Sequence, residues 1–275
     1  MRSPSHLSDR STASPSRTPP RRSIVDEVAD QIAFEIVAGV FPPGDRLPAV
    51  RALAGDHRIN ASTVQVVLAR LRQAGLIEAV PRVGMVVRDV ARYGGIETWH
   101  YFFRFSQRLP DKATRIFADF LTTRLVLLFE VVRLIAADCR RYDPGPVRRA
   151  VEQFELLAGE SPPQPLRLAQ AELRAARAMI LPLDHPVILA VFNSIVDILM
   201  QVPAVVGAMY ADPAFNLSVW HRLLDKWERG TLNASDIAQA EAAFRQFNAA
   251  CLERFRGLLQ SDALRRERAS SSDRA

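Results

Sequence analysis

Side chains that can bind phosphate and read base edges are concentrated between residues 46 and 88. This segment carries seven arginines against two acids, an excess of five positive charges. Guanidinium groups neutralise phosphates, whereas Asn, Gln, Ser and Thr side chains hydrogen-bond phosphates and bases. We therefore interpret the segment as a nucleic-acid interface. Its candidate contact residues are Arg46, Arg51, Asn60, Ser62, Thr63, Gln65, Arg70 and Arg82.

The apolar spacing of the same segment predicts two short helices that would position these side chains. Leu47-Pro48 begins the first helix, because proline is favoured where its missing N–H costs nothing. Residues 60–63 offer N-cap candidates for the second helix, and Gly75 is placed as its C-cap. The buried stripe of the second helix repeats every three or four residues and consists of Val64, Val67, Leu68 and Leu71.

A further helix precedes these two, and a β-ribbon follows them. Ser23 is a candidate N-cap for the first helix, which carries acids in its first turn where the helix dipole favours them. Residues 76–80 and 85–87 are typical of two paired strands joined by a turn. Three helices and a ribbon predict a winged helix-turn-helix domain over residues 23–90, whose third helix would enter the major groove of DNA.

Specific sequence motifs support this interpretation. They are Leu47-Pro48-Ala49-Val50-Arg51-x-Leu53-Ala54, Asn60-x-Ser62-Thr63-Val64 and Leu71-x-x-x-Gly75-Leu76-Ile77. In these motifs the segment resembles the DNA-binding domain of the GntR family of bacterial transcription regulators, which implies a double-stranded DNA operator as partner. The family usually has Arg where this chain has Ala61, and often where it has Gln65. Each missing Arg would remove a guanine contact worth about 1–3 kcal/mol of discrimination.

Length and composition limit the class of the whole chain. At 275 residues it is long enough for two domains, and its net charge of +6 fits a nucleic-acid partner. Cys139 and Cys251 suggest neither a disulfide framework nor a zinc site. We expect a cytoplasmic protein without a membrane span or signal peptide. Residues 1–22 and 261–275 are predicted to be disordered tails.

The pattern changes after residue 90. We expect a linker at 91–96 and, over 97–260, a helical domain, because this part has few turn residues and no alternating strand runs. The fold class is therefore mostly α, with the winged helix followed by an antiparallel bundle of six or seven helices. Proline at position 203 should kink the fifth helix. The expected helices are 97–107, 111–140, 146–158, 164–181, 186–210, 213–228 and 233–259.

Landmarks of the second domain are Gly95-Ile96, Asp184-His185-Pro186 and Trp220-His221-x-x-Leu224. With this order the chain resembles the FadR subfamily of GntR regulators. The resemblance implies a homodimer on a palindromic operator, most simply a repressor, with a small organic effector in the bundle. One branch of the subfamily senses small carboxylic acids through a metal held by Asp and His, and another binds a long-chain acyl-CoA.

The metal positions of the first branch fall on unsuitable residues in this chain. They correspond to Glu172, Ala176, His221 and a residue near Phe247 or Asn248. A transition-metal site needs three or four converging donors, so we expect no metal and no other cofactor. His221 is then interpreted as a hydrogen-bonded bundle histidine. The apolar fifth helix, which includes Phe192, keeps an acyl-CoA among the candidate effectors.

Arg124 falls on the apolar stripe of the second bundle helix, seven residues after Phe117 and seven before Val131. A buried guanidinium is costly unless it is paired. Its partner is either an internal acid, Glu172 or Glu130, or the carboxylate or phosphate of an effector. The candidate effector-binding residues are accordingly Arg124, Glu172, Phe192 and His221.

Two other classes of function compete with this interpretation. An enzyme would need a nucleophile, an acid-base pair or a cofactor motif, and the sequence offers neither a Gly-rich phosphate loop nor a Cys-His pair at suggestive spacing. An aminotransferase-like relative would need a Schiff-base lysine, and the chain has only Lys112 and Lys226. We therefore expect no enzyme. A constitutive DNA-binding dimer without an effector stays open as the alternative.

Overall fold

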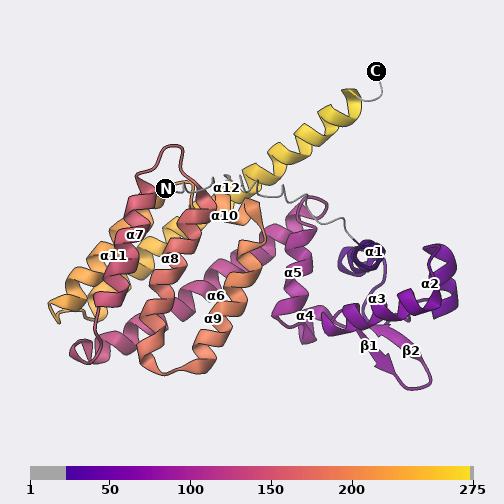
Figure 1. Ribbon diagram of the computed structural model, residues 1–275, viewed down its shortest axis with the longest axis horizontal. Helices are drawn as coiled ribbons and strands as arrows, with labels where there is room; N and C mark the ends of the chain where they lie inside the picture. The colour runs from indigo at the N-terminus through magenta and orange to yellow at the C-terminus, as the bar shows by residue number, and fades with distance from the viewer. Residues whose placement is uncertain (1–22, 273–275) are drawn as a thin grey trace, which may run out of the picture.

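The computed structural model describes residues 23–272 and consists of two helical bodies arranged along its longest axis (Figure 1). The N-terminal body lies at one end, and the C-terminal helical body at the other. Two helices, α5 (Ile96–Arg104) and α6 (Pro110–Ala137), lead from the first body into the second. The tail predicted for residues 1–22 lies outside the described residues.

The N-terminal body has the winged helix-turn-helix fold that the sequence predicts. Ser23 caps the first helix, because its hydroxyl accepts the N–H of Asp26 while the Asp26 carboxylate accepts the N–H of Ser23. The two strands pair antiparallel, with Ile77 opposite Val87. The elements in chain order are α1 (Ile24–Ala38), α2 (Val50–Asp56), α3 (Ala61–Gln73), β1 (Ile77–Val80) and β2 (Gly84–Val87).

The core of this body extends beyond the boundary expected from the sequence. Tyr101, Phe102 and Phe105 are buried among the apolar side chains of α1 and α3, so helix α5 packs into this core. The predicted linker at 91–96 is also partly helical, since α4 spans Val90–Tyr93. Helix α5 thus contributes to both cores, because Phe103 is buried in the C-terminal core, where its ring contacts that of Phe120 on α6.

The C-terminal body is a helical bundle, as predicted. Helices α7 and α8 lie side by side, and the long α12 packs against α6 and α10. Aromatic rings on these helices make close contacts in the core, such as Phe117 with Phe255 at 4.7 Å between centroids. The remaining helices are α7 (Gly145–Ala158), α8 (Pro165–Ile180), α9 (Pro186–Met200), α10 (Pro203–Met209), α11 (Pro213–Glu228) and α12 (Ala234–Ser272).

Two helices differ from the sequence prediction. The expected kink at Pro203 is a full break, and α9 and α10 meet at 104°. Proline has no N–H to continue the helix and clashes with the preceding turn. At the other end of the chain, α12 continues to Ser272, where a disordered tail was predicted from residue 261. Extension of a helix that is already formed adds a hydrogen bond for each residue without a new nucleation cost.

Membrane-spanning segments were sought in residues 23–272. No single helix there is both long and apolar enough to cross a membrane. The bent pair of α9 and α10 meets the criterion only when its two helices are taken together.

Candidate functional site

The N-terminus of α3 presents a polar cluster to solvent. The side-chain oxygen Oδ1 of Asn60 accepts hydrogen bonds from the Thr63 N–H at 2.7 Å, the Thr63 hydroxyl at 2.8 Å and the Ser62 hydroxyl at 2.7 Å. This fixes the cap and leaves the Asn60 amide nitrogen free to donate. Gln65 is exposed on the same helix, and so is Val66 at 54%. The sequence analysis did not name Val66 among the candidate contact residues, although its position outside the buried stripe predicts that it is exposed.

The seven arginines of residues 46–88 divide into two groups. Arg70 forms an ion pair with Asp26 of α1, and Arg88 lies 3.8 Å from Glu78. These two are thus held by internal carboxylates. The side chains of the other five arginines of residues 46–88 have no ion pair or hydrogen bond to any residue in 23–272. These five exposed arginines, which we call the free arginine set, are Arg46, Arg51, Arg58, Arg72 and Arg82.

Arg70 was predicted to contact DNA, and the structure turns it toward α1 instead. The hydroxyl and N–H of Ser23 and the Arg70 guanidinium together hold the pKa of Asp26 below its usual value. The guanidinium also faces the buried Tyr101 of α5. Arg70 thus joins α3 to α1 and is a poor candidate for a phosphate contact. The other predicted DNA-contact residues are exposed or half-buried on the elements around the N-terminus of α3.

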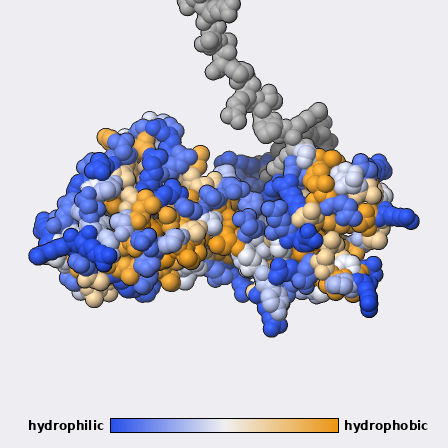
Figure 2. Space-filling model, turned by 60° about the horizontal axis from the view of Figure 1, so that its bottom comes forward, coloured by the Kyte–Doolittle hydropathy of each residue, from blue (hydrophilic) through white to orange (hydrophobic). Residues whose placement is uncertain are grey.

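Two arginines lie at the wing, one in its turn and one on the segment that bridges to β2. Arg46 pairs with Val86 in an isolated β-bridge, and its guanidinium lies over Gly84, where an added β-carbon would come within 3.3 Å of Nε. Arg82 lies in the turn between β1 and β2. In Figure 1 the wing tip, α2 and the N-terminal end of α3 lie together at the end of the molecule away from the helical body. Figure 2 shows that projections of this body are hydrophilic, as contacts to phosphates require.

The helical body contains a cavity of about 330 Å³ between α6, α8, α9, α10, α11 and α12. Its lining is mainly apolar and includes Phe192, which was predicted for the effector site. Of the acids in this lining Glu172 is buried, and its carboxylate accepts hydrogen bonds from the Tyr210 hydroxyl, Trp220 Nε1 at 3.2 Å and Asn216 Nδ2 at 3.3 Å. Burial and the adjacent Glu172 carboxylate hold the pKa of Tyr210 well above its usual value.

Arg124 also lines this cavity, on α6. Its guanidinium carbon lies 5.5 Å from the centroid of the Phe244 ring, a cation–π contact. Among residues 23–272 it has no ion pair or hydrogen bond: Glu130 pairs with Arg133 at 3.5 Å, and Glu172 has the three donors named above. Neither of the internal acids considered from the sequence is therefore its ion-pair partner. Its five N–H donors stay available to a ligand.

Comparison with known proteins identifies the N-terminal body. Residues 24–87 match the family model for bacterial regulatory proteins of the gntR family. An uncharacterized HTH-type transcriptional regulator of Mycobacterium tuberculosis is 50% identical over 72 residues, which cover 26% of this chain and 30% of that protein. The HTH-type transcriptional regulator Mce2R of Mycobacterium tuberculosis is 39% identical over 77 residues, covering 28% and 32%. The N-terminal body is a GntR-type winged helix-turn-helix domain.

The family model and these two relatives each match only part of the chain. The chain spans about a third of the length of these two relatives. A solved structure concerned with Lar, which controls the Listeria monocytogenes agr system, covers 86% of this chain and 98% of its own at 13% identity and a TM-score of 0.48. That likeness is too weak to support an argument about the helical body. The assignment of this chain to the FadR subfamily stays a prediction.

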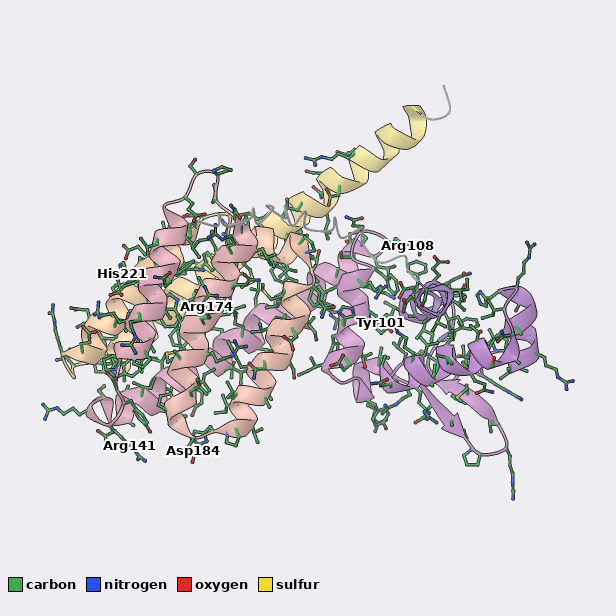
Figure 3. The ribbon with its side chains drawn as sticks, viewed as in Figure 1. Tyr101, Arg108, Arg141, Arg174, Asp184 and His221 are labelled. Atoms are coloured by element: carbon green, nitrogen blue, oxygen red, sulfur yellow. The ribbon has the colours of Figure 1, made fainter. Side chains whose placement is uncertain are left out.

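His221, predicted for the effector site, faces away from the cavity. Its Nε2 lies 3.4 Å from Oε2 of Glu155 on α7, and the side chain is 48% exposed. Figure 3 shows His221 on the side of the helical body formed by α7 and α11. The neighbouring Trp220 is buried and points inward, and successive residues on a helix are about 100° apart. The part of the chain that the structure describes contains no group of three side chains able to hold a metal ion.

A seam of contacts joins the GntR domain to α5 and α6. Lys112 Nζ lies 2.7 Å from the carbonyl oxygen of Val37 and 3.3 Å from that of Ala38, so it caps the C-terminus of α1. Arg104 pairs with Asp30. The further contacts are the Thr98 hydroxyl with the Ala74 carbonyl at 2.8 Å, and the Arg108 guanidinium over the Phe34 ring at 3.2 Å.

This seam has a direct connection to the cavity. Tyr101 and Arg108 lie at the junction of the two bodies in Figure 3. Helix α6 begins next to the seam and runs without a break to Arg124 and its neighbours on the cavity wall. Sequence reasoning missed the seam, since its pairs are separated by many residues and only Lys112 stood out, as one of two lysines.

Proposed function

We propose that this chain is a DNA-binding transcription regulator of the GntR type that acts as a homodimer on a palindromic operator. The observation that carries this proposal is the free arginine set on and around α3. Such an excess of unpaired positive charge beside a recognition helix is what phosphate neutralisation requires. The curated relatives named above, which share the GntR domain, are themselves described as transcriptional regulators. As a regulator the chain would act in the cytoplasm.

The helical body would hold a small organic effector in its cavity. The cavity volume of about 330 Å³ lies at the lower limit of the range for ligand pockets, roughly 300–1,000 Å³. This volume favours a small organic acid over a complete acyl-CoA. The guanidinium of Arg124 would bind its carboxylate, and the apolar wall, including Phe192, would enclose its body.

Effector binding would alter DNA binding through α6. This helix is part of the cavity wall at Arg124 and caps α1 at Lys112, so a shift at the wall would reach the GntR domain directly. A ligand that favours one spacing of the two recognition helices shifts the population toward that spacing. We propose repression that the effector relieves. A constitutive dimer would need no cavity of this kind, and no contact in the structure favours it.

The test starts from a duplex that the full-length chain selects from a random-sequence pool. Binding to this duplex is measured by fluorescence anisotropy for the wild-type chain and for Arg51→Ala, Thr63→Ala and Arg174→Ala. Arg174 is an exposed residue of α8 in the helical body, so its substitution is the matched loss of one charge away from α3. We expect both GntR-domain variants to bind at least about tenfold more weakly, and the Arg174 variant to bind like wild type. Failure of the wild-type chain to select any duplex would overturn the proposal.

A further inference from the structure

Helix α2 ends in a turn whose left-handed residue is an arginine. The N–H of Arg58 bonds to the carbonyl of Gly55 at 3.2 Å, and the N–H of Ile59 bonds to that of Ala54 at 3.0 Å. These two bonds make a Schellman cap, with Arg58 at the position that needs a positive φ, here 54°. Glycine normally occupies this position, because a β-carbon is strained there.

Other helices of the chain end in the way this rule predicts. Gly39 follows α1 with φ 91°, Gly75 follows α3 with φ 73°, and Gly230 follows α11 with φ 65°. Arg58 is therefore the less stable choice for closing α2. An unfavourable backbone conformation that persists in a structure points to a function of the side chain.

The side chain of Arg58 is free for such a function. It is exposed, and in residues 23–272 it has no ion pair, hydrogen bond or ring contact. Arg58 lies two residues before Asn60, the N-cap of α3. Among the described residues other than glycine, positive φ occurs at Arg58, Arg82 and Asp184. Two of these three are arginines, and they lie in the two loops that flank the exposed N-terminus of α3.

We propose that Arg58 is a DNA phosphate contact, held in a left-handed turn at the edge of the recognition helix. This inference rests on the proposed function. When the N-terminus of α3 enters the major groove, the turn before it borders the phosphate backbone beside that groove. The first two turns of α3 carry no positive charge, since Ala61 and Gln65 are neutral. Arg58 supplies the charge from the turn instead, and it acts on affinity for duplex DNA of any sequence.

The decisive variant is Arg58→Gly, because glycine suits the backbone and removes the charge. We expect its melting temperature to equal or exceed that of wild type, while its affinity for DNA falls. At about 0.1 M salt the affinity for DNA should fall about five- to tenfold per protomer. The slope of the logarithm of the DNA association constant against the logarithm of the salt concentration should decrease in magnitude by about one per protomer. The loss of affinity should be similar for the selected duplex and for an unrelated duplex of the same length.

Two further variants separate charge from backbone. Arg58→Lys keeps the charge in the same strained turn and should retain most of the affinity, whereas Arg58→Asn tolerates the left-handed conformation and should bind as weakly as Arg58→Gly. Arg174→Gln, in the helical body, controls for a general loss of one charge. It should leave both the affinity and the salt slope unchanged.

The outcomes distinguish this proposal from the function on which it rests. If Arg58→Gly keeps full affinity and salt slope while the wild-type chain binds its duplex, Arg58 is no phosphate contact and the regulator remains. If Arg58→Gly loses affinity together with melting temperature, its role is structural and the proposal is overturned. If the wild-type chain binds no duplex, both proposals are overturned.

Discussion

The ammonium nitrogen of Lys112 lies 2.7 Å from the carbonyl oxygen of Val37, at the C-terminus of α1. A positive charge at this end of a helix is favoured by the helix dipole and satisfies carbonyls that lack a partner within the helix. The bond joins the first helix of the GntR domain to the first turn of α6. It thus links the DNA-binding domain to α6, the helix that contributes Arg124 to the cavity wall.

Replacing this lysine should loosen the seam. We expect Lys112→Met to lower the free energy of unfolding by about 1 kcal/mol and to raise amide hydrogen exchange over residues 35–40, where α1 ends. Urea unfolding and hydrogen-exchange mass spectrometry measure the two effects. Lys226→Met is the matched control, because Lys226 pairs with Asp236 in the helical body at 3.4 Å. Equal exchange at the end of α1 in both variants would show that the Lys112 contact does not hold the seam.

Tyr210 should resist ionisation at alkaline pH. Its pKa is raised by burial and by the Glu172 carboxylate, so the native state keeps the proton more firmly than the unfolded state. A raised pKa contributes stability that is fully present below the ordinary value near 10 and is lost as the pH rises above it. Absorbance titration should therefore show a tyrosine that ionises only when the chain unfolds.

The variant Tyr210→Phe assigns that tyrosine, because it should remove the last component of the alkaline titration. Tyr101, whose pKa is also raised by burial, should ionise late in this variant too. Loss of an early component in Tyr210→Phe would contradict the buried hydrogen bond to Glu172.

Arg124 should bind the effector and contribute little to the fold. A thermal-shift screen of small carboxylic acids against the full chain would find a ligand, and Arg124→Gln should abolish its stabilising shift. The melting temperature of the ligand-free variant should change little, since no acid of the described residues is left unpaired by the substitution. Arg245→Gln is the control on α12, where Arg245 is exposed and lies 3.5 Å from Glu241. A large fall in melting temperature with an intact ligand shift would indicate a structural role for Arg124.

Filling the cavity should abolish the response of the protein to its effector and leave DNA binding without effector unchanged. Ala240 lines the cavity from α12, and Ala238, two residues earlier, is exposed. We expect Ala240→Phe to lose the ligand shift and the ligand effect on DNA affinity, because the added ring takes the space of the effector. Ala238→Phe should keep both. An unchanged ligand response in Ala240→Phe would place the effector site elsewhere.

The GntR domain could be predicted from sequence because its signals are local. Ser23 and Asn60 cap helices through atoms within three residues of them, and Gly75 has the positive φ expected after a helix. The stripe of Val64 and its partners needs only the period of a helix. Each of these features is set by a short stretch of chain, so residue order alone specifies it. The helical character of the second body follows from the same kind of pattern.

Tertiary structure decided which face of each helix meets which neighbour. The sequence placed Arg70 and His221 on helices, but packing turned Arg70 toward Asp26 and His221 toward Glu155. It also brought Tyr210 to Glu172, from 38 residues away in the chain. The rotation of a helix about its axis depends on the shapes of all the helices against which it packs. Helical periodicity therefore predicts that a residue is buried, but only the assembled core determines what it contacts.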